Sequence, residues 1–532
     1  MTRPPLACRF AATAIAAATV AASAAVMTTA PAAASAPSNV LTILQSAAPV
    51  SLNPVIENDW NSRESIGYMY DPLIYEGPNN SLRPGLATSW KGSDHAMVWT
   101  FQLRHGVTFQ DGTPWNAQAA VYNFQLDMKT TSLDYTDFVP WVKSVKAIGQ
   151  YTLQITLAKP DAEFIPILTW APLMVSPTAY RKEGAAGFAQ HPVGTGAYEF
   201  VSYAPNSTLI MKANPHYWGG APKIPEIKVE IVPSLTTEAL DMEAHTADFM
   251  YGPQASDLAA LRSHGVKIEQ TPTPSGDMVY FNLSKAPTND VNVRRAIMLA
   301  LDRAAMVKVV FDGYAQLDRA GVPNNSPFYH ANVPEIPYSP ARAKAILAAD
   351  GWKVGAGGVR YKDGKPLAIT ILSNSNAPWP EVSQILQEEL SKVGFEARIV
   401  TQDWGTFLNS GRAGDYSIAY WGLGGFSTYT WDGTVNMYSK DYWNISQMKD
   451  NPSMAGIQRQ IDAIYNKEVG QSNVAQRSAT LLQFQRLDYK DVLVGWLWTP
   501  LEVFAVSPSL HNYAFNDWMY LFLNSHSTLG GR

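Results

Sequence analysis

The sequence predicts an α/β protein of several domains with mixed sheets. The chain has 532 residues, more than one hydrophobic core usually serves, so we expect two or three domains. Its first half carries short runs in which apolar and polar residues alternate, the pattern of half-buried strands. After about residue 280, helical spacing alternates with short strand-like runs, and this β-α-β order is typical of an α/β lobe.

The first residues have the pattern of an export signal. Arg3 and Arg9 precede an alanine-rich apolar run, and small residues suited to cleavage follow around Ala34 or Ala36. We therefore expect residues 1–36 to be a cleavable signal peptide, with a short membrane anchor as the alternative. No later run reaches the ~18 apolar residues that a membrane span needs, so the mature protein is expected to be soluble.

Cysteine content and charge narrow the class of protein further. Cys8 is the only cysteine and lies in the signal-like segment, so neither disulfides nor thiol catalysis are expected in the mature chain. Cys8 precedes the apolar run instead of following it, which argues against a lipoprotein anchor and favours the periplasm of a double-membraned bacterium. Charged residues make up 16% of the chain and the net charge is −5 without long basic runs, which disfavours binding to nucleic acid or anionic membranes.

Strands and one helix are predicted in the first half. Within residues 97–109, Trp99, Phe101 and Leu103 alternate with polar residues, as in a half-buried strand. Asn116 is placed to cap a helix with one apolar face. Further alternating strands are expected at residues 151–157, 207–213 and 227–233.

Helices dominate the pattern of the second half. Residues 290–306 have apolar side chains at helical spacing, with Asp290 or Asn292 as a cap. The remaining elements are a helix from Ser339-Pro340 to Gly351, a hairpin that turns at Asp363-Gly364 and whose second arm enters the core, a helix over 381–393 that stops at Gly394, and a strand from residue 396.

Six segments together resemble one family, the large solute-binding proteins of ABC importers known as family 5, the peptide/nickel/opine class. The segments are LRPGLATSW (82–90), WTFQLRHGVTFQDGTPWNAQAAVYNF (99–124), HPVGTGAYEF (191–200), NPHYWGGAPKIPEIKVEIVP (214–233), VRRAIMLALDR (293–303) and FEARIVTQDWGTFLNSGRAGDYSIAYWG (395–422). They occur in the family's order and cover nearly all of the mature chain.

The resemblance implies a three-domain periplasmic binding protein, a type II-like clamshell with an extra domain. Domain I would comprise residues 37–77, 196–281 and 503–532, domain II residues 78–195, and domain III residues 282–502. The solute would lie between domains I and III and be enclosed when they close about a hinge.

The segment Gly194-Thr195-Gly196 has a structural role in this interpretation. It lacks the Lys-Ser/Thr end of a phosphate-binding loop and is not a nucleophile motif. In the family it is the joint where the chain leaves the extra domain and re-enters the first. The glycines would permit positive φ and a close approach of two backbones.

Neither a metal centre nor a catalytic site is predicted. The nine histidines form no H-x-x-x-H pair, and the loops 168–177 and 433–444 lack the Arg and His that a nickel-type site would want. There is no G-x-S-x-G, although spacing leaves a distributed triad open. Because the family couples binding to transport, we expect no enzyme and no cofactor, with a secreted hydrolase as the alternative from another class.

The charge anchors of peptide-binding relatives are missing at the corresponding positions. In those relatives an aspartate three positions after the equivalent of Trp421 neutralises the peptide's α-ammonium, and here that position is Gly424. Dipeptide-binding relatives also grip the carboxylate with an arginine, but the corresponding loop 373–381 has no basic residue. A buried ammonium without a counter-charge is costly, so ordinary dipeptides are not expected. Asp432 is either a substitute anchor or a helix-start residue.

Aromatic side chains are expected to take the place of these charges. Rings of Trp and Tyr stack on sugars, apolar groups or cations with ~0.5–2 kcal/mol each beyond area burial. Trp404 and Trp421 hold positions that line the cleft in peptide-binding relatives, while about half of the other aromatic candidates are expected to be core. The predicted ligand-binding residues are Trp404, Trp421, Tyr420, Gly424, Gly425, Phe426, Tyr429, Trp431, Asp432, Asn376 and Trp379, with Trp170 on the domain II loop and Gln45, Ser46 and Ala47 after the first strand. A plain surface loop is an equal alternative for these last three.

These features predict the periplasmic substrate-binding component of an ABC importer, which captures a peptide or other small organic solute between two lobes. An oligosaccharide or another weakly charged solute is the alternative within transport. The expected partners are the solute and the transmembrane subunits of an ABC permease, with no nucleic acid and no membrane insertion, and the protein is expected to be a monomer.

Overall fold

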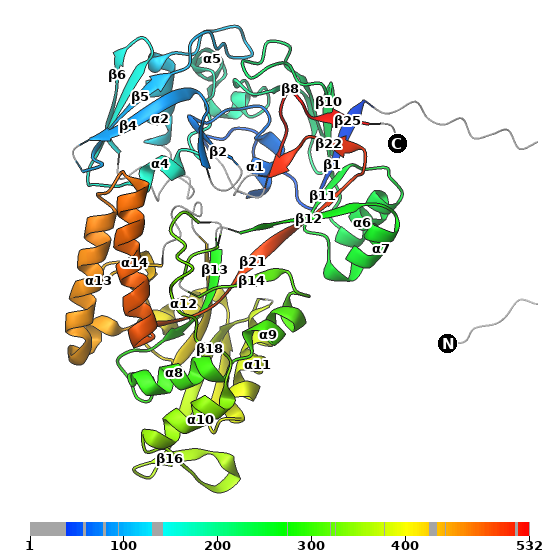
Figure 1. The fold of residues 1–532 in the computed structure, drawn as a ribbon. Coiled ribbons are helices and arrows are strands. Elements are labelled where there is room, and N and C mark those ends of the chain that lie inside the picture. Colours follow the sequence, from blue (N-terminus) through cyan, green and yellow to red (C-terminus); the bar gives the residue numbers. More distant parts are fainter. Residues whose placement is uncertain are drawn as a thin grey trace, which may run out of the picture. The chain divides into compact units, whose positions relative to one another are not determined.

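The structure is a computed structural model. It describes residues 39–56, 60–77, 81–93, 95–129, 142–273, 275–319, 321–324, 326–376, 378–424, 433–441, 443–515 and 520–530. These residues form helices and several sheets, the largest of twelve strands (Figure 1). The predicted α/β class with mixed sheets is confirmed.

The twelve-stranded sheet has the order β19-β18-β20-β13-β21-β11-β1-β10-β9-β8, and β12 and β14 also pair with β21. β1 is parallel to β10 and β11, β18 is parallel to β19 and β20, and the other pairs are antiparallel. The strands are β1 (Val40–Gln45), β8 (Tyr198–Ala204), β9 (Thr208–Ala213), β10 (Glu226–Ile231), β11 (Phe249–Tyr251), β12 (Lys267–Pro272), β13 (Ser275–Phe281), β14 (Ala315–Leu317), β18 (Ala368–Asn374), β19 (Glu396–Gln402), β20 (Ile418–Gly424) and β21 (Val494–Val506).

The long strand β21 belongs to both halves of this sheet. Its residues 494–500 pair with β13 and β14, and its residues 501–506 pair with β12 and β11. Strand β13 packs with the second half, because residues 278–281 share a buried cluster with residues of helix α8 (Val291–Ala300) such as Ile297. We therefore propose that the chain passes into the second half just before β13. The division into three domains otherwise stays a prediction.

A separate four-stranded antiparallel sheet, β4-β5-β7-β6, packs with α2 and α4 around a core of its own. Trp99, Phe101 and Leu103 are buried in β5, as their alternation predicts. The predicted cap Asn116 accepts from the backbone N–H groups of Gln118 and Ala119. The elements of the chain up to residue 188 are α1 (Trp60–Ile66), β2 (Ile74–Gly77), β3 (Ser81–Pro84), β4 (Ala87–Ser93), β5 (Val98–Leu103), α2 (Ala117–Asp127), β6 (Val142–Gly149), β7 (Thr152–Leu157), α4 (Phe164–Ile167) and α5 (Pro177–Phe188).

Two helices of the second half begin at predicted caps. Asp290, rather than Asn292, caps α8, and Ser339 caps α10. The predicted turn at Asp363-Gly364 has positive φ at both residues, and its second arm pairs as β17 before the chain enters the main sheet as β18. The other elements are α6 (Leu235–Glu243), α7 (Leu258–Ser263), α8 (Val291–Ala300), α9 (Arg303–Val310), α10 (Pro340–Ala349), β15 (Lys353–Val354), β16 (Arg360–Lys362), β17 (Lys365–Pro366), α11 (Trp379–Ser391), α12 (Trp404–Ala413), α13 (Ala455–Glu468), α14 (Val474–Asp491), β22 (Leu510–His511), β23 (Ala514–Phe515), β24 (Leu521–Phe522) and β25 (Thr528–Leu529), with single 3-10 turns η3 (Ala255–Asp257), η4 (Ala356–Gly358), η5 (Val435–Met437), η6 (Met448–Asp450) and η7 (Pro452–Met454).

The glycines of Gly194-Thr195-Gly196 allow two backbone segments to touch. A Cβ atom at Gly194 would lie 2.2 Å from the carbonyl oxygen of Met69, and one at Gly196 would lie 2.3 Å from its carbonyl carbon. Neither glycine has positive φ, so the close approach is the reason for both. Between them, the hydroxyl group of Thr195 donates to Asp71 at 2.7 Å. The segment therefore has a structural role, because it holds two backbone segments in contact.

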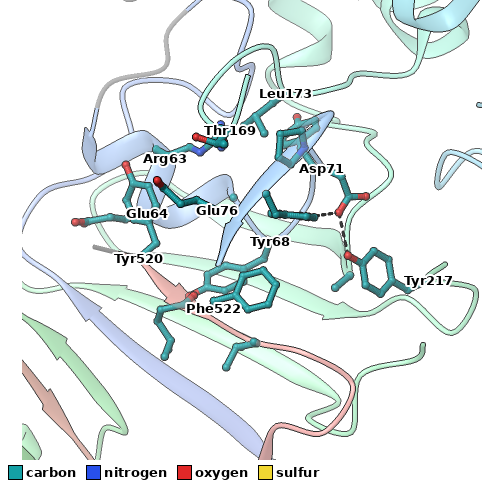
Figure 2. A pocket seen from close by; sticks show the side chains of 17 residues that line it. Arg63, Glu64, Tyr68, Asp71, Glu76, Thr169, Leu173, Tyr217, Tyr520 and Phe522 are labelled. Carbon is teal, nitrogen blue, oxygen red and sulfur yellow. Dashed lines mark hydrogen bonds between the residues drawn. The ribbon is translucent and has the colours of Figure 1, made fainter. Parts of the chain in front are cut away.

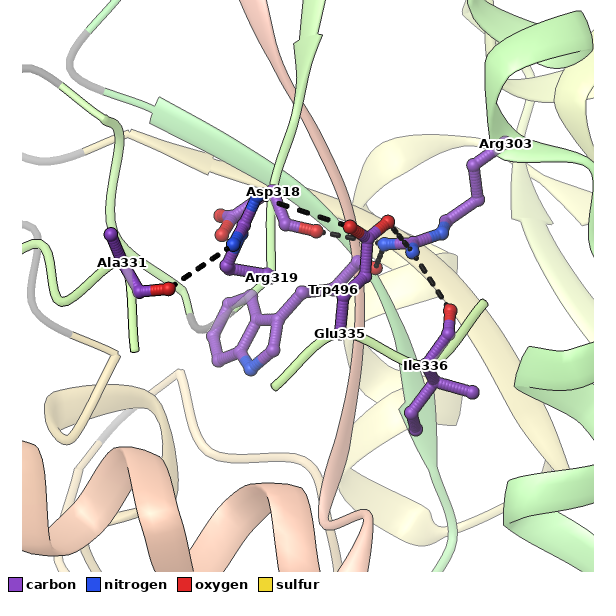
Figure 3. Close-up of polar contacts among 7 residues, drawn as sticks. All are labelled: Arg303, Asp318, Arg319, Ala331, Glu335, Ile336 and Trp496. Carbon is purple, nitrogen blue, oxygen red and sulfur yellow. Dashed lines mark hydrogen bonds and ion pairs between the residues drawn. The ribbon is translucent and has the colours of Figure 1, made fainter. Parts of the chain in front are cut away.

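A buried arginine ties the segment between β14 and α10 to β21 (Figure 3). Arg303, the first residue of α9, donates to the carbonyl oxygens of Asp318 at 2.8 Å and Trp496 at 3.0 Å. The same guanidinium pairs with Glu335 at 2.6 Å and donates to the carbonyl oxygen of Ile336 at 3.0 Å. One side chain thus holds both ends of this segment against the central strand.

Arg477 of α14 contacts two carboxylates. Its Nε lies 2.5 Å from Oε2 of Glu468, and its Nη2 lies 2.6 Å from Oε1 of Glu163, just before α4. The side chains of Arg477 and Glu468 are only 3% and 0% exposed. Removal of the guanidinium would therefore leave a buried negative charge without its main partner.

We predict that Arg477→Met lowers the free energy of unfolding by about 3–5 kcal/mol, because Glu468 stays buried. Lys392→Met is the control, since it breaks an exposed pair with Glu388 whose side chains are 58% and 69% exposed. Such exposed pairs on one helix contribute only about 0.3–0.5 kcal/mol. Urea unfolding followed by circular dichroism measures both, and equally small losses would contradict the assignment.

Candidate functional site

Three neighbouring strands of the second half end at one edge of the main sheet. β18 runs parallel to β19 and to β20, so the carboxyl ends of all three lie at the same edge. Helix α11 begins at Trp379 shortly after β18, and α12 begins at Trp404 directly after β19. In open α/β sheets, ligands bind outside the carboxyl ends of the strands. This edge is the candidate site of the second half.

Five aromatic side chains form a connected group at this edge, which we call the aromatic cluster: Trp379, Trp404, Phe407, Trp421 and Trp443. Trp404 stacks on Phe407 with 5.7 Å between ring centroids, and its centroid also lies 5.7 Å from that of Trp421. Trp404 and Trp443 keep 41% and 36% of their surface exposed, whereas Phe407 and Trp421 are fully buried. The cluster therefore presents two rings to the outside over a buried aromatic base.

Two of the predicted site residues lie inside the fold. Trp421 and Tyr420 are 0% and 1% exposed, and the Tyr420 hydroxyl donates to Asp277 at 2.6 Å. In this conformation neither ring offers surface to a solute. We propose that both support the exposed rings, a role that sequence position alone did not distinguish from direct contact.

The other predicted residues of the second half fall into two groups. Asn376 is exposed, Trp379 is half-buried, and Gly424 is the last residue of β20, so all three lie at the candidate edge. The remaining ones, Gly425, Phe426, Tyr429, Trp431 and Asp432, lie outside the described residues. Their contact with a solute stays a prediction.

A carboxyl group that sequence reasoning missed lies at the same edge. Asp277 of β13 accepts from the hydroxyl of Tyr420 at 2.6 Å and from the indole nitrogen of Trp498 at 2.7 Å, both at its Oδ2. Burial raises the pKa of Asp277 to about 6, against the opposing effect of these two hydrogen bonds. The available signal was an acidic residue inside an apolar strand, SGDMVYF (275–281), but only the strand pairing shows where it lies.

The first half carries the remaining predicted residues at the carboxyl end of β1, a strand parallel to both of its neighbours. Gln45 is buried and its side chain is engaged within the fold. Its Nε2 donates to the carbonyl oxygen of Asn61 at 2.6 Å, and its Oε1 accepts from the Ser65 hydroxyl. Ser46 is exposed and Ala47 half-buried, and their contact with a solute stays a prediction.

A cavity of about 70 Å³ lies beside α1 and β2 (Figure 2). Asp71 on its wall is fully buried and accepts from Tyr217 at 3.0 Å, from Trp218 at 2.8 Å, and from Tyr75. Burial raises the pKa of Asp71, while these hydrogen bonds oppose the shift. The volume is far below the ~300–1,000 Å³ of typical ligand pockets, so we regard this cavity as part of the framework.

The predicted residue Trp170 lies next to this framework. Its ring is 6% exposed and stacks on Tyr520 at 6.0 Å, while the guanidinium of Arg63 lies 5.0 Å from the ring centroid. Two wider hollows of about 310 and 640 Å³ lie near the start of α14. None of the predicted site residues lines any of these three spaces.

The described part of the chain contains neither a metal-binding cluster nor a membrane-spanning helix. Within it, no group of three or more His, Cys, Asp or Glu side chains is arranged to hold a metal ion. Among the same residues, no helix combines the length and the apolar character needed to cross a membrane.

We predict that Trp421→Ala and Trp404→Ala differ in their effect on stability. Truncation of the fully buried Trp421 should lower the free energy of unfolding by about 3–5 kcal/mol, because a cavity remains in the core. Truncation of the exposed Trp404 should lower the free energy of unfolding by about 1 kcal/mol or less. Chemical denaturation of both variants measures the difference, and similar losses would show that the two rings have the same structural role.

Comparison with known proteins is consistent with this arrangement. Residues 81–445 match the bacterial extracellular solute-binding proteins, family 5 Middle. The chain is 27% identical over 510 residues to the probable D,D-dipeptide-binding periplasmic protein DdpA of Escherichia coli, with 92% of this chain and 94% of the relative covered. It is 32% identical over 364 residues to the glutathione-binding protein GsiB of Escherichia coli, with 67% and 68% covered.

Solved structures share the fold. HbpA2 from Haemophilus parasuis has a TM-score of 0.81 at 21% identity, covering 92% of this chain and 99% of that one. The nickel ABC transporter from Bacillus halodurans has a TM-score of 0.79 at 23% identity, covering 92% and 100%. By name these relatives are binding and transport proteins, not enzymes. The chain belongs to family 5 of the bacterial extracellular solute-binding proteins.

Proposed function

We propose that the protein is the periplasmic substrate-binding component of an ABC importer and captures a peptide or another small organic solute between two lobes. Family membership supports solute binding. The observation that carries the proposal is the position of exposed rings and polar groups at the carboxyl ends of β18, β19 and β1, where α/β proteins bind ligands. The periplasmic relatives and the signal-like residues 1–36 support the location.

Capture would proceed by closure of the two halves about the places where the chain crosses between them. Strand β21 pairs with both halves, and β12 and β13, which follow each other in the chain, pair with its opposite ends. A small rotation of the backbone there moves the halves together as units. A solute that contacts both halves stabilises the closed form, which gives the permease a liganded state to recognise.

Peptide is the substrate class that we favour. Relatives are named for binding D,D-dipeptide and glutathione, and others for binding heme and nickel. Gly424 and the loop 373–381 lack the charges that would grip both ends of a dipeptide. A longer peptide held by its backbone therefore fits better than a dipeptide. A weakly charged solute such as an oligosaccharide is the second candidate, favoured by the exposed rings of Trp404 and Trp443.

The first experiment identifies the solute directly. Native mass spectrometry of the purified mature protein should show a small molecule that is released on denaturation. Panels of short peptides and of oligosaccharides then separate the two candidates, because a ligand at a hundred times its Kd adds about 2.7 kcal/mol of stability and raises the Tm. Conversion of the solute into products would indicate the secreted hydrolase instead, and the lack of any shift would contradict solute capture.

We predict that Trp404→Ala weakens binding of the identified solute by about 1–3 kcal/mol, because an exposed ring at the strand edge packs on it. Tyr361→Ala is the control, since Tyr361 is 38% exposed on the separate sheet β15-β16-β17. Isothermal titration calorimetry gives both affinities. Unchanged affinity in a folded Trp404 variant would remove this residue from the site.

A further inference from the structure

Two indole N–H groups of β21 each donate to a buried aspartate of the second half. Trp496 donates to Oδ2 of Asp488, and Trp498 donates to Oδ2 of Asp277, both at 2.7 Å. Burial raises the pKa of each carboxyl group to about 6. The two sites therefore form a matched pair, and they differ in the second carboxyl oxygen.

The second oxygen of Asp488 is engaged by the protein, whereas that of Asp277 is not. Oδ1 of Asp488 accepts from the backbone N–H groups of Leu493 at 3.1 Å and Val494 at 3.0 Å. Both donors to Asp277, Tyr420 and Trp498, reach its Oδ2. Within the described ranges no donor reaches Oδ1 and no Lys, Arg or His pairs with it, although a carboxylate accepts about four hydrogen bonds.

The open oxygen lies at the candidate edge. Asp277 pairs across the strands with Gly422, and a Cβ atom at Gly422 would lie 2.6 Å from Oδ1 and 3.9 Å from the ring of Trp379. Because residue 422 has no side chain, the carboxylate of Asp277 can lie directly against its backbone, beside that ring. Gly424, the position of the missing aspartate, is two residues further along the same strand.

A purely structural role would not require a charge here. An asparagine at 277 could still accept from Trp498 and Tyr420 through its carbonyl oxygen and would avoid the cost of a buried carboxylate. An acid with one free oxygen instead suits a ligand that brings its own positive charge. The rings of Trp379, Tyr420 and Trp498 around it also favour a cation.

We infer that Asp277 holds a protonated amino group of the solute and makes the protein selective for ligands with a free amine, such as peptides with an unblocked amino terminus. The inference rests on the proposed solute-binding function. Asp277 on β13 supplies the negative counter-charge that is missing at Gly424 on β20. The carboxyl end of the peptide gains no corresponding anchor, so selection acts at the amino end.

The test compares two probe sets on ligand-free protein: short peptides with free amino termini and the same peptides N-acetylated. The natural protein should bind the free-amine set about 10- to 100-fold more tightly, as expected for a hydrogen bond between charged groups. Asp277→Asn keeps the acceptor for Trp498 and should lose that preference. Asp488→Asn, the matched control, should keep it, because both oxygens of Asp488 are already engaged within the protein.

Each outcome decides a separate point. Equal binding of both sets by the natural protein, or an unchanged preference in Asp277→Asn, overturns the inference while solute capture stands. Binding of oligosaccharides but of neither peptide set overturns it as well and favours the second candidate solute. Binding of no probe contradicts the proposed function itself. Intrinsic tryptophan fluorescence and the Tm show whether the variant is folded.

The pH dependence gives a second readout. Protonation of Asp277 removes the negative charge, so affinity for the free-amine set should fall up to tenfold per pH unit below about 6. Of the described residues packed against the carboxyl group, Gly422, Tyr420, Trp498 and Trp379, only Tyr420 titrates, and burial holds its pKa well above its usual range. Asp277→Asn should show a flat profile, and a parallel fall in both proteins would contradict the assignment.

Discussion

The pairing of β21 with strands of both halves is the constraint on which the rest of the structure depends. A strand of 13 residues that pairs with β13 at its start and with β12 at its end sets the register of a strand in each half. Its buried indoles fix two aspartates, and Arg303 fastens the preceding segment to its backbone at Trp496. The candidate edge is therefore positioned by the pairing of β21 and by these side-chain hydrogen bonds.

Helix caps and turns depend on neighbouring residues, and the sequence predicted several of them correctly. Asn116, Ser339 and the Asp363-Gly364 turn each act through their own backbone neighbours, so their roles were readable without tertiary context. Helices α13 and α14 were not predicted. The face that α14 buries includes Arg477, Gln485 and Asp488, so the apolar spacing that identifies a helix is interrupted by polar groups whose partners lie far away in sequence.

The sequence likewise predicted some residues of the candidate site and missed others. The resemblance to the family predicted that Trp404 lies at the cleft, and Trp404 and Trp379 are found at the starts of the helices that follow β19 and β18. The burial of Trp421 and Tyr420 depends on what covers each face of β20, and that is a tertiary property. Asp277 is separated from Tyr420 by 143 residues, so only the register of β13 against β20 brings its carboxyl group to the edge.

The paired strands and the aromatic residues at their edge are separate parts of the structure, and this separation has a consequence for evolution. Trp379 and Trp404 stand at helix starts and contribute no main-chain bond to the ladder of strands, so their replacement leaves the pairing of β21 intact. A lineage can then exchange one nutrient for another through a few substitutions at these positions without passing through an unfolded ancestor. Relatives that share this fold are therefore expected to bind different solutes.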